Sequence, residues 1–101
     1  MKRTHVGSER WFDVLLDTDD AQAAVMTLEP GRSTGGPRNA HADSDQWLYV
    51  IDGAGSAVVD GDSVALAAGD LVVIEAGETH EITADGDATL ETLSLYTPPE
   101  Y

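Results

Sequence analysis

Turn signals recur along this chain every eight to twelve residues, and that spacing restricts its possible folds more than any other feature. Clusters of glycine, aspartate and proline separate apolar runs that are too short for most helices and long enough for strands. These runs lie at residues 11–16, 46–52, 71–74 and 88–96. The Asp60-Gly61 pair is typical of a two-residue hairpin loop. The pattern predicts seven or eight short strands in an all-β sandwich or small barrel.

Residues 21–29 could be read as a helix because they are rich in alanine. They carry no apolar stripe at the helical spacing, and Pro30-Gly31 ends them sharply, so we predict a strand. The glycines of the loop at 30–40 do not form a phosphate-binding loop, because no Gly-Lys-Ser/Thr sequence follows them. We expect an N-terminal arm at 1–10 and one domain at 11–101, which ends in an extended tail.

The charge balance argues against several classes of partner. Nineteen acidic residues face five basic ones, which gives a formal net charge of −14. Nucleic acids and anionic membranes are therefore not expected partners, because phosphate contacts need a basic face. Lysine is nearly absent while aspartate and alanine are abundant, a bias that resembles proteins of a salt-accumulating cytoplasm. An ordinary acidic protein is the alternative interpretation.

The chain has no cysteine, which excludes disulfides, cysteine-ligated zinc, iron–sulfur clusters and a cysteine nucleophile. No apolar run approaches the roughly 20 residues of a membrane span. The charged start of the chain is not followed by an apolar core, so no signal peptide is expected and the predicted location is cytoplasmic.

Two of the three histidines occupy matching positions. His41 lies in a polar loop just before the run at 46–52, and His80 lies at the junction between a glycine turn and the next apolar segment. One imidazole delivered at each of two strand ends suits a metal site inside a β-barrel.

The region around His80 resembles the second motif of the cupin superfamily, Gly-x5-Pro-x-Gly-x2-His-x3-Asn. Gly69, Gly77 and His80 keep its spacing, whereas Glu75 and Ala84 replace the usual proline and asparagine. The resemblance covers roughly residues 20–97.

The first cupin motif, Gly-x5-His-x-His-x(3,4)-Glu-x6-Gly, is matched less closely. Counting back from Gly53 places Gln46 at the glutamate, His41 at the second histidine and Asn39 at the first; Ser33 takes the leading glycine. A rival alignment starts from Gly35, places His41 at the first histidine and Asp43 at the second, and leaves the following distance one residue short. We prefer the first alignment because it keeps every spacing after Asn39.

The resemblance implies a double-stranded β-helix, a jelly-roll barrel, with a divalent metal ion in its mouth. The family pattern supplies three histidines and one glutamate. Here the corresponding candidate metal ligands are His41, His80, Gln46 and Asn39. Iron, manganese, nickel, zinc and copper all tolerate imidazole with oxygen ligands, so the metal stays open among these five.

Each candidate also has a purely structural interpretation. His80 could be held by a backbone carbonyl, and a buried Gln46 could bond to His41 or to water. Asn39 could be a turn residue. Asp43 and Asp45 could replace a missing ligand or form a solvated acidic loop. Arg38 could bind an anionic substrate group, or it could balance one of these aspartates at the surface.

We therefore expect a small single-domain cupin that binds one divalent metal and a small molecule. If it is an enzyme, a metal-dependent oxygenase or isomerase of a small oxygen-rich substrate is expected. The alternatives are a non-catalytic ligand-binding or sensor barrel with weak or no metal, and a structural barrel that only dimerises.

A homodimer is expected from one strand. If Gln46 faces the barrel interior, the two-residue period turns Trp47, Tyr49 and Ile51 outward. Such a face needs a cover, either residues 11–12 of the same chain or a second subunit.

Overall fold

The computed structural model describes residues 1–36 and 39–101, which form eight strands and no helix in these ranges. The strands are β1 (Phe12–Asp17), β2 (Gln22–Leu28), β3 (Asp45–Asp52), β4 (Ala54–Val59), β5 (Asp62–Ala67), β6 (Leu71–Ile74), β7 (His80–Ala84) and β8 (Leu90–Thr97). The prediction of an all-β chain is confirmed, and residues 22–28 are a strand despite their alanines. No helix in the described ranges could cross a membrane.

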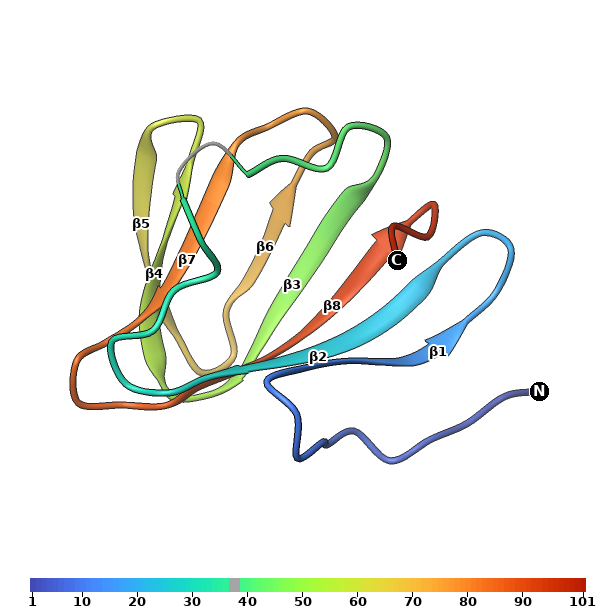
Figure 1. The fold of residues 1–101 in the computed structure, drawn as a ribbon, viewed down its shortest axis with the longest axis horizontal. Coiled ribbons are helices and arrows are strands. Elements are labelled where there is room, and N and C mark those ends of the chain that lie inside the picture. The colour runs from blue at the N-terminus through green and yellow to red at the C-terminus, as the bar shows by residue number, and fades with distance from the viewer. Residues whose placement is uncertain (37–38) are drawn as a thin grey trace.

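The strands form two antiparallel sheets that face each other (Figure 1). The larger sheet has the order β1-β2-β8-β3-β6, and the smaller has the order β5-β4-β7. Strands distant in sequence therefore become neighbours: β8 lies between β2 and β3 and pairs with both along most of its length. This arrangement brings the start of β3, the start of β7 and the end of β8 to the same end of the barrel.

The core fills the space between the sheets. It contains Met26, Leu28, Leu48, Val50, Ala57, Leu66, Ile74, Ile82, Ala84 and Leu90. Strict alternation along β3 explains which side chains reach it, because successive residues of a strand point to opposite faces. Gln46, Leu48 and Val50 are buried, whereas Trp47 and Tyr49 are 44% and 43% exposed.

Two turns follow from backbone chemistry. Asp60 and Gly61 both have positive φ, at 48° and 84°, as the predicted two-residue hairpin between β4 and β5 requires. Gly53 ends the first motif at φ 89°, and a Cβ there would collide with the main-chain oxygen of Thr89. Residue 53 must therefore be glycine, because the neighbouring backbone leaves no room for a side chain.

The two ends of the chain lie on the side of the molecule that carries the β1–β2 turn (Figure 1). Residues 1–10 form no strand and are exposed, and Lys2 Nζ donates a hydrogen bond to the Asp17 carbonyl at 2.8 Å. After β8 the tail turns back, and Ser44 Oγ donates to the Pro98 carbonyl at 2.8 Å. The tail is therefore held against the barrel, where the sequence predicted only an extended end.

Candidate functional site

A cavity of about 230 Å³ opens where β3 and β7 begin and β8 ends. It is lined by Trp11, Phe12, Met26, Thr34, Asn39, Ala40, His41, Gln46, His80, Ile82, Tyr96 and Tyr101. The cavity is thus built from both sheets, from the loop before β3 and from the tail. Four of the five predicted site residues line it.

Backbone hydrogen bonds between two loops bring the histidines together. The His80 N–H donates to the Asn39 carbonyl at 2.7 Å, and the Gly77 N–H donates to the His41 carbonyl at 2.8 Å. The two rings consequently lie with their centroids 4.8 Å apart and their planes tilted by 38°. The predicted convergence of His41 and His80 is therefore present in the structure.

His80 is 6% exposed, and its Nδ1 forms no well-aligned hydrogen bond with any described residue. Burial is the main cause that lowers the pKa of His80, the nearby His41 lowers it further, and the backbone of Glu78 raises it by a smaller amount. His80 is therefore neutral at pH 7, which is the form of imidazole that binds a metal.

Gln46 lines the cavity and is 3% exposed. Its Nε2 donates to Ser94 Oγ at 3.0 Å, whereas the structural interpretation of this residue considered His41 or water as its partner. Its Oε1 is buried without a partner among the described residues. An unsatisfied buried acceptor costs about 1–3 kcal/mol, which favours an ion, a water molecule or a ligand donor at this position.

The tail supplies an acidic and an aromatic neighbour to His41. Glu100 Oε1 lies 3.1 Å from His41 Nδ1. The Tyr96 ring stands edge-on to His41 at 5.3 Å, and the Tyr101 ring does so at 6.0 Å. Burial, and after it the adjacent Tyr101, raises the pKa of Tyr96 well above its ordinary value, so its phenol stays protonated.

The remaining predicted residues contribute less directly. Asn39 lines the cavity, but its side-chain Nδ2 donates to the Thr34 carbonyl at 3.2 Å, as a loop-forming residue would. Asp45 Oδ1 accepts from the Ala76 N–H at 2.9 Å and Asp43 is exposed, and neither lines the cavity. Arg38, the predicted substrate contact, lies outside the described residues.

Residues 24–96 match the family model for the cupin domain. The chain belongs to the cupin family. Cupins often bind divalent metal ions and small molecules. No curated protein sequence matches this cupin.

Solved structures agree with this assignment. A protein from Bacillus halodurans aligns with a TM-score of 0.86 at 23% identity, over 93% of this chain and 74% of that one. KdgF from Halomonas sp. aligns with a TM-score of 0.79 at 25% identity, over 87% of this chain and 77% of that one. A predicted oxalate decarboxylase from Thermotoga maritima aligns with a TM-score of 0.78 at 29% identity, over 87% of this chain and 79% of that one. The double-stranded β-helix expected from the sequence is confirmed.

The donor set of this cupin fits a metal ion only with help from Gln46 or from a bound ligand. Among residues 1–36 and 39–101, no three histidine, cysteine, aspartate or glutamate side chains cluster closely enough to hold one. His41, His80 and Gln46 nevertheless line one cavity, and the Gln46 amide oxygen has no partner in the part of the chain that the structure describes. Nitrogen and oxygen donors of this kind suit a transition metal with open coordination positions.

Sequence reasoning missed four residues of the site in this cupin: Ser94, Tyr96, Glu100 and Tyr101. Ser94 and Tyr96 are buried on the inner face of β8. The two-residue alternation along 90–97 puts both on one face and was the signal that could have found them. In the structure, Tyr96 on that face pairs with Gln46. The tail residues follow no such period and carried no comparable signal.

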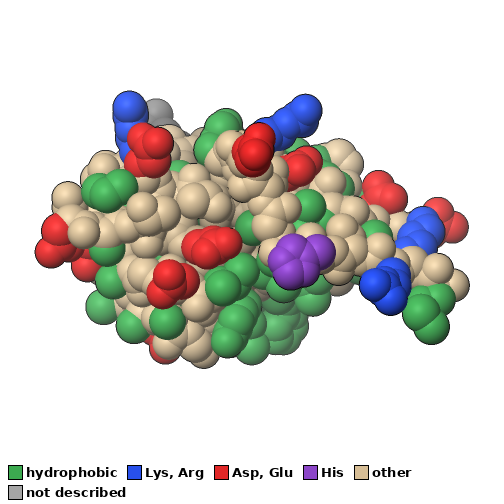
Figure 2. All heavy atoms as spheres, turned by 90° about the horizontal axis from the view of Figure 1, so that it is seen from below, with side chains coloured by type: hydrophobic (Ala, Val, Ile, Leu, Met, Phe, Trp, Pro, Cys, Tyr) green, Lys and Arg blue, Asp and Glu red, His purple; other side chains and the backbone are tan. Residues whose placement is uncertain are grey.

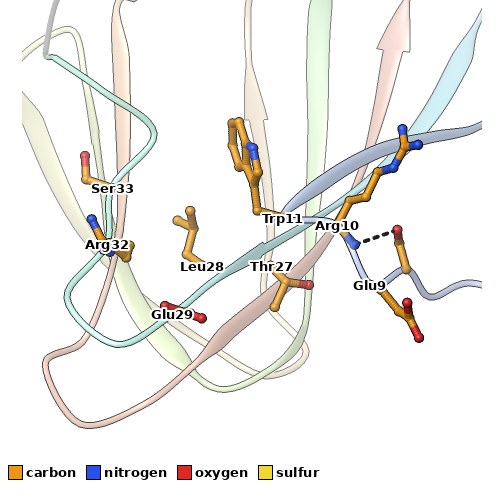
Figure 3. A pocket seen from close by; sticks show the side chains of 9 residues that line it. Glu9, Arg10, Trp11, Thr27, Leu28, Glu29, Arg32 and Ser33 are labelled. Atoms are coloured by element: carbon orange, nitrogen blue, oxygen red, sulfur yellow. Dashed lines mark hydrogen bonds between the residues drawn. The ribbon is translucent and has the colours of Figure 1, made fainter.

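A wider hollow of about 490 Å³ lies on the outside of this cupin between the N-terminal arm and the loop after β2 (Figure 3). Trp11 and Leu28 contribute apolar surface, while Glu9, Arg10, Glu29 and Arg32 contribute two charges of each sign. Both histidines of the cavity are absent from its lining. Its charges offset one another, so it is a weaker candidate site than the barrel cavity.

Proposed function

We propose that this cupin binds one divalent transition metal ion through His41, His80 and Gln46 and presents it to a small molecule. The observation that carries the proposal is the convergence of two imidazoles, with ring centroids 4.8 Å apart, on a cavity where the buried Gln46 Oε1 has no hydrogen-bond partner within residues 1–36 and 39–101. Asn39 is the fourth candidate ligand and is supported by its place in the lining. Iron, manganese, nickel, zinc or copper would suit this set.

The cavity restricts the size and chemistry of the ligand. At about 230 Å³ it lies below the roughly 300–1,000 Å³ of common ligand pockets, which favours a small molecule. The protonated Tyr96 phenol can donate a hydrogen bond, while Met26 and Ile82 supply apolar walls. The similarity to a predicted oxalate decarboxylase at 29% identity supports a small oxygen-rich ligand.

A bound metal would supply Lewis-acid polarisation of a ligand oxygen. If the cupin is an enzyme, an oxygenase or isomerase reaction of such a substrate is the proposed class. In that case His80 stays neutral, Tyr96 holds its proton near the substrate, and the surrounding apolar side chains exclude water.

A non-catalytic binding or sensor protein is the second candidate. The neutral Gln46 favours it, because an amide leaves the charge of a metal less compensated than a carboxylate does. Thermal melting with small dicarboxylates, measured with and without added metal, separates the two. Stabilisation that persists in metal-free protein supports the second candidate, and stabilisation that requires metal supports the first.

Elemental analysis of untagged protein purified without added metal tests the proposed site. We expect sub- to near-stoichiometric transition metal in the wild type. His41→Ala and His80→Ala should each abolish it, and Gln46→Ala should weaken its retention, because each removes one donor. His5→Ala is the matched control, since His5 lies in the exposed arm. Metal retained at the wild-type level by His80→Ala would refute the assignment.

We also propose that the protein is a homodimer joined through the outer face of the larger sheet. Trp47 on β3 pairs in register with Val73 on β6 and with Leu95 on β8, and Tyr49 pairs with Leu71. All five of these side chains are 41% or more exposed. Trp11 and Phe12, the alternative cover considered from the sequence, line the cavity, which supports a second subunit as the cover.

A further inference from the structure

The tail at residues 98–101 is held by a binding arrangement built into the barrel. Gln22 Nε2 donates to the Tyr101 main-chain oxygen at 2.6 Å, and Gln22 Oε1 accepts from the Tyr101 N–H at 2.8 Å and the Glu100 N–H at 3.2 Å. Gln22 is 3% exposed. A buried amide needs hydrogen-bond partners, and Gln22 finds them in the tail. Gln22 therefore connects β2 to the tail.

A second buried side chain and an aromatic contact fix the path of the same segment. Ser44, which is 1% exposed, donates to the Pro98 carbonyl. The Tyr101 ring packs against Phe12 at 4.8 Å and edge-on to Tyr96 at 5.2 Å. The tail is thus anchored at both of its ends, and Figure 1 shows it turning back beside β8.

This anchoring places a carboxylate against one of the two cavity imidazoles. Glu100 Oε1 lies 3.1 Å from His41 Nδ1, and the two side chains are 27% and 12% exposed. A carboxylate at this distance favours a proton on Nδ1 and leaves Nε2 as the nitrogen with a free lone pair. Glu100 also adds one negative charge to the site, where Gln46 stands at the glutamate position of the cupin motif and is neutral.

We propose that Glu100 is a positioning residue for His41, delivered from outside both sequence motifs by the Gln22-anchored tail. It sets the tautomer and orientation of the imidazole and offsets part of the charge of a bound cation. The second effect rests on the metal-binding function proposed above, whereas the first does not require a metal.

Long-range ¹H–¹⁵N spectra of metal-free protein at about pH 8 test the first effect. We expect the Nδ1-protonated tautomer of His41 in the wild type. Glu100→Gln keeps an acceptor and should largely retain this tautomer, and Glu100→Ala should lose the preference. Gln22→Leu should have the same effect as Glu100→Ala, because it releases the tail without touching His41.

Titration with Ni²⁺ by calorimetry tests the second effect. Outer-sphere partners of metal ligands typically change affinity by about 10–100-fold, so Glu100→Ala should weaken binding at least tenfold. Ni²⁺ binding by Glu100→Gln should be weakened as well, because this variant lacks the negative charge. Asp87→Asn removes the same charge at an exposed turn and should stay within about twofold of the wild type.

The two measurements separate failure of this proposal from failure of the metal site. If the wild type binds no Ni²⁺, the proposed metal function fails, and the tautomer of His41 still decides the role of Glu100. An unchanged His41 tautomer in both folded Glu100→Ala and folded Gln22→Leu would overturn the proposal. So would Glu100→Ala binding Ni²⁺ as tightly as Asp87→Asn does.

Discussion

His80 couples the stability of the barrel to pH. Its pKa is lowered in the folded protein, chiefly by burial and then by His41, so the unfolded chain binds more protons. The free energy of unfolding therefore rises with pH. This contribution is fully present above the unfolded pKa of about 6.5 and is lost as the pH falls through the lower folded value.

Urea unfolding of metal-free protein between about pH 5 and 8 checks this prediction. Relative to the wild type, His80→Gln should flatten the dependence of the unfolding free energy on pH. His5→Gln removes an exposed imidazole and should leave that dependence unchanged. Equal slopes in the wild type and His80→Gln would contradict the assignment of this effect to His80.

The β3 strand separates two functions by alternation: Gln46 faces the cavity, and Tyr49 faces outward. A dimer through the outer face would bury Tyr49, and burial of each large apolar side chain contributes about 1.5–3 kcal/mol. Tyr49→Glu would place a carboxylate in that interface. We expect it to raise the dimer Kd by about two orders of magnitude or more, without loss of metal.

Light scattering at molar salt measures this effect. The wild type should have twice the 10.7 kDa mass of one chain. Ser63→Glu adds the same charge to an exposed position of the smaller sheet and should leave the dimer intact. A wild-type mass near 10.7 kDa at all concentrations would rule out the dimer.

The whole molecule carries a formal charge of −14, and Figure 2 shows acidic side chains distributed over one face with few basic ones. Repulsion among these charges opposes the compact state, and salt screens it. The melting temperature should therefore rise from tens of millimolar to molar potassium chloride. Near pH 4.1, the pI of the chain, the screening part of this rise should largely disappear. A flat or falling melting temperature at neutral pH would refute adaptation to salt.

Local patterns predicted much of the fold. The hairpin at Asp60-Gly61, the strand at 71–74 and the inward direction of Gln46 all follow from turn chemistry and from the two-residue period. The spacing around His41 and His80 indicated their convergence, because each histidine lies just before or at the start of a strand. These features depend on neighbouring residues, so a sequence alone carries them.

The surroundings of the two histidines depend on how distant segments of the chain pack together. Gln22 and Tyr101 are 79 residues apart, and they meet because β8 lies between β2 and β3. Glu100 reaches His41 through that same arrangement. The sequence was sufficient to predict the buried face of β3, since alternation is a property of a single strand. The strand order determined which buried faces and loop ends share the cavity, since that order depends on packing between segments distant in the chain.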